Sequence, residues 1–279
     1  MTTKKEKPPK APKPIKEKKP TQYALVIEKL FKDRYTAGAT SIDFNREDLL
    51  TIATSLGVSP KNIGDLLYSF RFRNPLPPSI ISTQPEGREW IIQLAGRARY
   101  RFRLAKANRI VPNKSLATIK IPDSTPEIIA RYKLDDEQGL LAKVRYNRLL
   151  DIFLGLTTYS LQNHLRTTVE DLGQIEIDEL YVGLDRHGCH YIIPVQAKGG
   201  KDQISIVQTE QDTRWCAQEF PDLRCRAISV QFAENEQIAI FELKIEDSDL
   251  LELKIVEEKH YKLVPSDQLD KKQISDYRT

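Results

Sequence analysis

The chain has 279 residues, of which 40% are hydrophobic, with 43 Lys and Arg against 39 Asp and Glu. This composition suits one large globular domain or two ordinary ones, and it excludes a collagen, a disulfide-stapled miniprotein and a wholly disordered chain. No apolar run approaches the roughly eighteen residues of a membrane span, and the charged N-terminus lacks the apolar core of a secretory signal. Three cysteines without metal-ligand spacing (Cys189, Cys216 and Cys225) predict free thiols in a reducing, cytoplasmic compartment.

The net charge of +4 is unevenly distributed along the chain. Residues 1–20 carry a net +6, residues 21–120 a net +8 and residues 121–279 a net −10. This asymmetry indicates contact between the N-terminal part and nucleic acid or another anionic surface. Residues 1–20 are rich in Lys and Pro and have almost nothing to bury, which predicts a disordered basic tail. Such a tail either keeps the protein soluble or attracts phosphates without sequence preference.

Residues 21–104 show the order of elements of a winged helix-turn-helix. Apolar residues recur with helical spacing from Tyr23 to Phe31, and a short β-like stretch follows at Ser41–Phe44. Asn45 is suited to cap a second helix that Gly57 ends, and Ser59-Pro60 opens a third that runs to about Phe70. Two β-like runs, 79–83 and 90–94, then flank a Pro-Glu-Gly turn. Helix, short strand, helix, helix and hairpin together predict a winged-helix domain that binds DNA.

The third helix is the predicted reading element of this domain. The residues expected to contact DNA from it and its end are Lys61, Asn62, Ser69, Arg71 and Arg73. After the predicted wing, four arginines alternate with other residues at Arg97, Arg99, Arg101 and Arg103. In a strand, that spacing places one basic face towards phosphates. The alternative interpretation is a basic but merely solvated helix or linker.

Residues 105–134 contain three prolines among polar residues and are predicted to be a linker, so the second domain spans residues 135–279. A long amphipathic helix is expected from Asp135 to about Leu156. Strands follow at 164–169, 174–184 and 189–196, then a helix at 202–220 and a strand at 225–232. This αβββαβ order predicts an α/β domain. The end of the chain reads as a hairpin, 238–245 with 251–257, and a further strand at 261–264, either added to the sheet or forming an oligomer edge.

A cluster of polar residues is expected where the second and third strands of this domain pair. If their turn centres on His187, Asp178 lies opposite Gln196 and Glu176 lies opposite Lys198, all on one face. The other face then carries apolar residues: Ile175, Ile177, Val195 and Ala197. The simpler interpretation of this cluster is that it forms the solvated polar face of a sheet. Charged groups at the end of an apolar strand favour a functional site.

These residues resemble the PD-(D/E)XK nuclease superfamily. Asp178, a hairpin-length gap and the run Val195-Gln196-Ala197-Lys198-Gly199-Gly200 carry the resemblance, most clearly from Ile177 to Asp212 and less clearly over 137–232. The resemblance implies a Mg²⁺ ion, for which Mn²⁺ substitutes, held by Asp178, Gln196, the Ala197 carbonyl and Glu137. It implies that Lys198 positions or deprotonates the attacking water and that the product carries a 5′-phosphate.

The chain departs from the superfamily at Gln196, where an acid is usual. An amide offers a carbonyl oxygen but no charge, which weakens Mg²⁺ binding. Glu176 or Glu137 is expected to supply the missing charge. On the helix after Lys198, the polar residues Gln208, Glu210, Gln211 and Asp212 are predicted to form a solvated face. The alternative, which the resemblance implies, is that this helix lines the DNA path. Trp215 is expected in the core.

The expected protein is therefore a two-domain DNA endonuclease, most simply a sequence-specific, type II-like restriction enzyme acting on double-stranded DNA. The sequence has no G-x-x-x-x-G-K-[ST] run, which suits an autonomous enzyme. Double-strand cleavage favours a homodimer, because one such site cuts one strand. A cognate DNA methyltransferase is not visible from one chain. Two rivals stay open: a DNA-binding regulator with an inactive nuclease fold, and a structure-specific repair nuclease.

Overall fold

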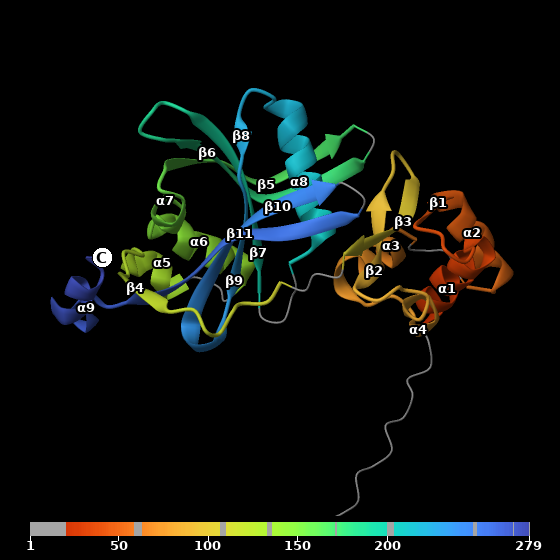
Figure 1. The fold of residues 1–279 in the computed structure, drawn as a ribbon, viewed down its shortest axis with the longest axis horizontal. Helices are drawn as coiled ribbons and strands as arrows, with labels where there is room; N and C mark the ends of the chain where they lie inside the picture. Colours follow the sequence, from red (N-terminus) through yellow and green to blue (C-terminus); the bar gives the residue numbers. More distant parts are fainter. Residues whose placement is uncertain are drawn as a thin grey trace, which may run out of the picture.

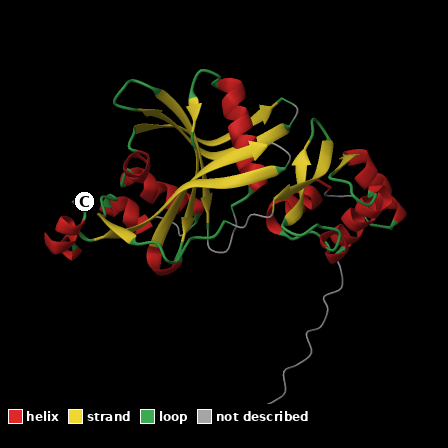
Figure 2. Cartoon of the chain, in the orientation of Figure 1, coloured by secondary structure: helices red, strands yellow, loops and turns green. Residues whose placement is uncertain are grey.

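The computed structural model describes residues 21–58, 63–106, 110–132, 136–170, 172–199, 204–247, 250–269 and 271–278. The predicted tail, the Ser59-Pro60 helix start, Lys61 and Asn62 lie outside these residues. The fold is mixed α/β, built around one mixed sheet of 11 strands with helices packed on it (Figure 2). The predicted α/β class is confirmed. None of the described helices is long and apolar enough to cross a membrane.

The first part of the chain largely follows the predicted element order. Its elements are α1 (Gln22–Arg34), β1 (Ser41–Asn45), α2 (Arg46–Ser55), α3 (Ile63–Tyr68), the π-helix η1 (Ser69–Arg73), α4 (Pro78–Ile81), β2 (Arg88–Leu94) and β3 (Arg99–Lys106). Asn45 is the N-cap of α2, and the Asp48 carboxylate accepts the Asn45 backbone N–H at 2.6 Å. Gly57 follows α2 with φ +66°, a left-handed conformation suited to glycine.

One predicted strand of this part is wrong: residues 79–83 begin inside the short helix α4. Pro78 stands in its first turn, where a missing N–H costs nothing, and the Pro77 carbonyl accepts the N–H groups of Ile80 and Ile81. The hairpin is formed instead by β2 and β3, which pair antiparallel from Arg88↔Lys106 to Leu94↔Tyr100. The arginine row is thus the second strand of the wing-like hairpin and does not follow it.

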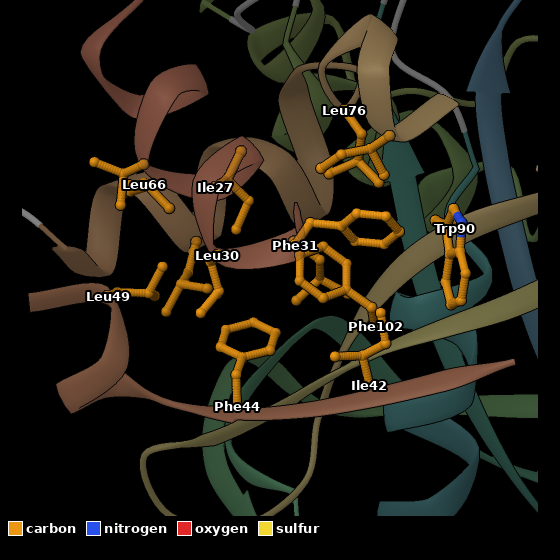
Figure 3. Packing of buried hydrophobic residues seen from close by; sticks show 14 of the residues in the cluster. Ile27, Leu30, Phe31, Ile42, Phe44, Leu49, Leu66, Leu76, Trp90 and Phe102 are labelled. Carbon is orange, nitrogen blue, oxygen red and sulfur yellow. The ribbon is translucent and has the colours of Figure 1, made fainter. Parts of the chain in front are cut away.

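An aromatic-rich core holds α1, α2, α3 and the β1–β3 strands together (Figure 3). Phe31 is 1% exposed and packs against Tyr35, Trp90 and Phe102, with ring centres 5.0–5.3 Å apart. Phe44 adds a further ring contact with Phe102 at 5.0 Å. The predicted apolar face of the first helix is confirmed, because Val26, Ile27, Leu30 and Phe31 are all buried.

The second part of the chain begins within the predicted linker. Residues 105–134 include β4 (Thr118–Pro122), which pairs with the sheet, and α5 (Glu127–Tyr132). The elements that follow are α6 (Glu137–Tyr146), α7 (Leu149–Leu154), β5 (Thr157–Val169), β6 (Gly173–Leu184), β7 (His190–Lys198), α8 (Ile206–Glu219), β8 (Arg224–Cys225), β9 (Ala227–Phe232), η2 (Glu234–Glu236), β10 (Gln237–Asp247), β11 (Leu251–Val264), η3 (Ser266–Gln268) and α9 (Lys271–Asp276). The order helix, three strands, helix, strand is as predicted.

The predicted long helix over 135–156 is wrong, because it is broken between α6 and α7. Arg148 adopts the left-handed region at φ +49°. Asn147 is fixed by contacts distant in sequence: its amide donates to Thr125 Oγ1 at 2.9 Å, and its Oδ1 accepts the Ser124 N–H at 2.6 Å. These bonds hold the turn at the end of α6.

The strands run in the order β1-β3-β11-β10-β9-β7-β6-β5, with β2 on β3, β4 on β11 and β8 on β7. β7 pairs antiparallel with β6 and parallel with β9. At the β5 end of this order, the register with β6 shifts at a bulge between Ser160 and Gln162, and His164 has φ +48°. β11 pairs with β3 at Leu251↔Ala105, which joins the strands of the first and second parts of the chain (Figure 1).

Helices cover both faces of the central strands. α6 and α7 pack on one face, where Ile193 and Val195 of β7 join Val230 of β9. α8 crosses the other face (Figure 1), where Trp215 and Cys216 pack against Ile177, Leu180 and Ile192. The predicted apolar face is thus divided: Ile175 and Ile177 belong to the α8 cluster, and Val195 and Ala197 to the α6 cluster.

Candidate active site

A pocket of about 910 Å³ lies where β6 begins and β7 ends, beside the start of α6. Its lining includes four of the predicted catalytic residues, namely Glu137, Glu176, Asp178 and Lys198, together with Ala197. Gln208 and Gln211 of α8 line it as well, and so do Tyr68, Arg71, Phe72 and Arg73 of α3 and η1. Residues from three separate regions of the sequence therefore meet around one cavity.

Asp178 is placed by the register of the β6–β7 hairpin. The predicted pairing, centred on His187, is confirmed for the six pairs from Leu184↔His190 to Glu179↔Val195. One residue further on, Asp178 Oδ2 accepts the backbone N–H of Ala197 at 2.9 Å. Burial raises the pKa of this half-buried carboxyl, while the Ala197 N–H and the nearby Lys198 act to lower it.

Glu137 reaches the same end of β7 from the first residue of α6. Asp136 is the helix N-cap, and its carboxylate accepts the Gly139 N–H at 2.9 Å. Glu137 Oε1 accepts the Gly199 N–H at 3.3 Å. Backbone N–H groups two residues apart in an extended chain are separated by roughly 7 Å and point to the same side. The Asp178 and Glu137 carboxylates therefore accept two N–H groups that lie on the same side of the chain, those of Ala197 in β7 and of Gly199 directly after it.

Lys198 is held in the pocket by α8. Its Nζ donates to Gln208 Oε1 at 2.7 Å, and its charge acts on the carboxyls of both Asp178 and Asp212. A lysine tethered through a neutral amide keeps its charge available to a phosphate or to a water molecule.

Gln196 does not line the pocket. Its side chain is 2% exposed and points to α8, where Nε2 donates to Asp212 Oδ2 at 2.5 Å. Asp212 is also 2% exposed, and burial raises its pKa to about 8, with the nearby Asp178 charge adding to the rise. Within the described residues, Gln196 Oε1 and Asp212 Oδ1 have no hydrogen-bond partner. The uncharged amide of Gln196 and the carboxyl of Asp212, which retains its proton, therefore lie behind the pocket wall.

The predicted solvated face of α8 is wrong. Glu210, Gln211 and Asp212 are 3%, 5% and 2% exposed. Glu210 accepts a hydrogen bond from Gln93 of β2 and forms an ion pair with Arg214 at 2.8 Å. Burial on the sheet, and against the β2–β3 hairpin, removes these side chains from water. The prediction of Trp215 as a core residue is confirmed.

His164 and Arg166 of β5 also line the pocket, and neither was expected there from the sequence. His164 Nδ1 lies 3.6 Å and Arg166 Nε 3.3 Å from the Glu176 carboxylate. Glu176 is exposed and lies beside these two side chains, and its charge also acts on the Asp178 carboxyl. Because Gln196 does not line the pocket, the four-residue polar face predicted for the hairpin is present only in part.

The predicted DNA-binding residues fall into two groups. Arg71 and Arg73 line the pocket, and Ser69 lies beside them in η1, its Oγ accepting the Asn74 amide at 2.7 Å. The arginines of the hairpin lie elsewhere: Arg101 pairs with Asp43 at 2.5 Å and Arg103 with Asp247 at 2.5 Å.

Arg97 and Arg99 are the remaining members of the predicted arginine row, and both are exposed at the β2–β3 turn and the start of β3. The basic face expected from the alternating arginines is therefore partly neutralised by the carboxylates that pair with Arg101 and Arg103.

The pocket offers few protein ligands to a small, hard cation such as Mg²⁺. The described residues hold no group of three or more His, Cys, Asp or Glu side chains arranged to bind a metal. Two carboxylates, Asp178 and Glu137, face the pocket beside the Ala197 peptide. Mg²⁺ typically keeps several waters and binds through one or two carboxylates plus substrate phosphates, so these residues fit such an ion.

In comparisons with known proteins, no protein-family model, curated protein or solved structure matches this chain.

Proposed function

We infer that the chain is a metal-dependent DNA endonuclease whose active site is the pocket at the ends of β6 and β7. The observation that carries this proposal is the convergence of Asp178, Glu137 and Lys198, three residues named by the PD-(D/E)XK resemblance, on one cavity. Two carboxylates can hold a metal ion, and a lysine beside them can stabilise the negative charge that develops during phosphodiester hydrolysis. The αβββαβ order around the pocket supports assigning this part to the restriction-endonuclease-like fold, and the β2–β3 hairpin after α3 supports a winged-helix module.

In this proposal, Asp178 and Glu137 hold Mg²⁺, and the Ala197 carbonyl completes the protein ligands. The ion supplies a Lewis acid for the scissile phosphate and lowers the pKa of a bound water. Lys198, kept in place by Gln208, orients the attacking water and stabilises negative charge as it develops. Gln196 contributes by fixing β7 against Asp212, and hydrolysis leaves a 5′-phosphate.

The form of the activity that we propose is sequence-specific cleavage of double-stranded DNA, with the exposed Arg73, Arg97 and Arg99 among the contacts. A cytoplasmic enzyme acting as a homodimer, accompanied by a methyltransferase that protects the host site, fits this form. The rival is a regulator that binds DNA without cutting it. The position of Gln196 behind the wall, where it offers the pocket no charge, favours this second candidate.

The test is incubation of the purified full-length chain with long unmethylated DNA, in Mg²⁺ and in EDTA. We expect discrete fragments in Mg²⁺, and losses of at least a hundredfold in rate for Asp178→Ala and Lys198→Ala with DNA binding retained. Lys259→Ala is the matched control, because Lys259 lies exposed on β11 in an ion pair with Glu257. Tight binding with no Mg²⁺-dependent cleavage of any DNA would establish the regulator instead.

A further inference from the structure

Two arginines and two aromatic rings form a continuous chain of contacts, called the stack below, in the part of the pocket wall that comes from α3 and η1. The Arg73 guanidinium lies 4.7 Å from the centre of the Tyr68 ring. The centres of the Tyr68 and Phe72 rings are 5.1 Å apart, and the rings are tilted by 58° to each other. Arg71 closes the stack, 4.7 Å from the centre of Phe72. Surfaces of this kind bind nucleic-acid strands, because bases stack on the rings and phosphates pair with the cations.

The π-helical turn is what builds this stack. The Asn74 N–H donates to the Ser69 carbonyl at 2.8 Å, five residues back. In this wider turn, Arg73 lies over Tyr68, five positions before it, while in an α-helix the two side chains would diverge. Single π-turns are uncommon and occur frequently at functional sites.

The residues of the stack differ in how accessible they are to a ligand. Arg71 is half-buried and donates to the Ile92 carbonyl at 3.3 Å, so it anchors η1 to β2. Tyr68 is 47% exposed, Arg73 is also exposed, and Arg73 forms no ion pair within the part of the chain that the structure describes. Tyr68 and Arg73 are therefore the two groups available to a substrate in the pocket.

One pocket of about 910 Å³ is lined by Tyr68 and Arg73 together with Asp178 and Lys198. Within a duplex, the neighbouring bases cover both faces of each base. A base can therefore lie on the Tyr68 ring only after it has left the duplex stack.

We propose that the DNA strand to be cut enters this pocket unpaired, with a base stacked on Tyr68 and a phosphate bound by Arg73. The scissile phosphate of the same strand then lies at Asp178 and Lys198. This proposal rests on the proposed nuclease function and refines its substrate: the duplex is opened at the site of cleavage, and one of its strands enters the pocket unpaired. An enzyme that acts on an opened duplex has to meet the free-energy cost of unpairing the bases, which is lowest where the strands are already separated.

A second cavity supports a strand path across η1. It measures about 480 Å³ and adjoins the first, since Arg71, Phe72 and Arg73 line both. Its walls come from residues 70–76, from β2 and from the start of α8, with apolar side chains such as Trp90 and Ile206 beside polar ones such as Asn74 and Glu89. An unpaired base displaced beside Phe72 would find both apolar surface and hydrogen-bonding groups there.

The first experiment measures binding without cleavage. The full-length chain is titrated in EDTA against a fluorescein-labelled single strand of about 12 nucleotides, and anisotropy is recorded. We expect Tyr68→Ala and Arg73→Ala each to weaken binding roughly tenfold to a hundredfold, and Tyr68→Phe to restore most of the affinity. Tyr132→Ala is the matched control, because Tyr132 is 71% exposed on α5 and does not line the pocket.

The second experiment compares cleavage in Mg²⁺ of three substrates with the same sequence: a full duplex, a duplex with a short central unpaired stretch, and the single strand. We expect the opened duplex and the single strand to be cut at least tenfold faster than the full duplex. Equal rates on all three, with unchanged single-strand binding by Tyr68→Ala, would overturn the inference and leave the nuclease function intact. Binding that depends on Tyr68 without any cleavage would support the strand site and contradict the nuclease.

Discussion

Replacing Asp212 by asparagine should make the protein less sensitive to pH. The carboxyl is 2% exposed, and its pKa is about 8 in the fold against an ordinary 3.8. Between these values the folded chain retains a proton that the unfolded chain has lost. The contribution of Asp212 to the free energy of unfolding therefore falls as the pH rises from about 4 to about 8. The substituted amide has the same shape and no proton to lose, and its oxygen can still accept the hydrogen bond from Gln196.

The size of the effect follows from the two pKa values. Each pH unit between them is worth about 1.4 kcal/mol. The stability of Asp212→Asn relative to the wild type should therefore improve by up to about 3 kcal/mol from pH 5 to pH 7. Above about pH 8 the difference should stop growing, because both states of the wild type are then ionised.

Urea denaturation in EDTA at a series of pH values from 5 to 9 measures this difference. Asp33→Asn is the control for deleting one carboxylate, because Asp33 is exposed on α1 in an ion pair with Lys29. A difference between Asp212→Asn and wild type that stays constant, or shrinks as the pH rises, would refute the assignment of a proton to buried Asp212.

Three further outcomes are expected. Phe31→Ala should lower the free energy of unfolding by about 3–5 kcal/mol in urea denaturation, because it empties the centre of the aromatic core; a loss below about 1 kcal/mol would contradict the packing. Asp43→Ala should change stability by less than about 1 kcal/mol while raising DNA affinity severalfold at low salt, because it frees Arg101; unchanged affinity would show that β3 does not face DNA. Millimolar Mg²⁺ should raise the melting temperature of wild type but not of Asp178→Ala, and equal shifts would place the ion elsewhere.

The sequence predicted the hairpin that carries Asp178 and Lys198 because the information for it is local. Alternating apolar residues identify β6, and the continuous apolar run Ile192–Val195 identifies β7. The short turn at residues 185–188 fixes their register to within one residue. A slip of one position would have placed Asp178 on the opposite face. The confirmed pairs from Leu184↔His190 onwards show that the turn alone was sufficient.

Features determined by distant contacts were missed. The break after α6 depends on Asn147 bonding to Ser124 and Thr125, some twenty residues earlier. The run Ser-Ile-Ile-Ser at residues 79–82 is short and apolar, which suits a strand and a buried helical turn equally well. Pro78 in the first turn was the signal that favoured the helix.

The buried acids of α8 could have been found from helical spacing. Glu210 follows Ile206 by four positions, and Gln211 lies four after Val207 and four before Trp215. Polar residues that continue an apolar stripe are expected to be buried with it. The contribution of Tyr68 and Arg73 to the pocket had no comparable signal, because it depends on a π-turn and on how the first part of the chain docks.

The irregular course of β5 has a consequence for self-association. The outer edge of β5 is long and carries the exposed side chains of Tyr159 and Leu161. A regular edge strand of this kind can pair with a strand of another molecule and cause aggregation. The bulge at Ser160 and Gln162 and the left-handed His164 interrupt the straight run of backbone that such pairing needs. Straightening this strand, for example by deleting Leu161, would favour copies of the chain that assemble edge to edge.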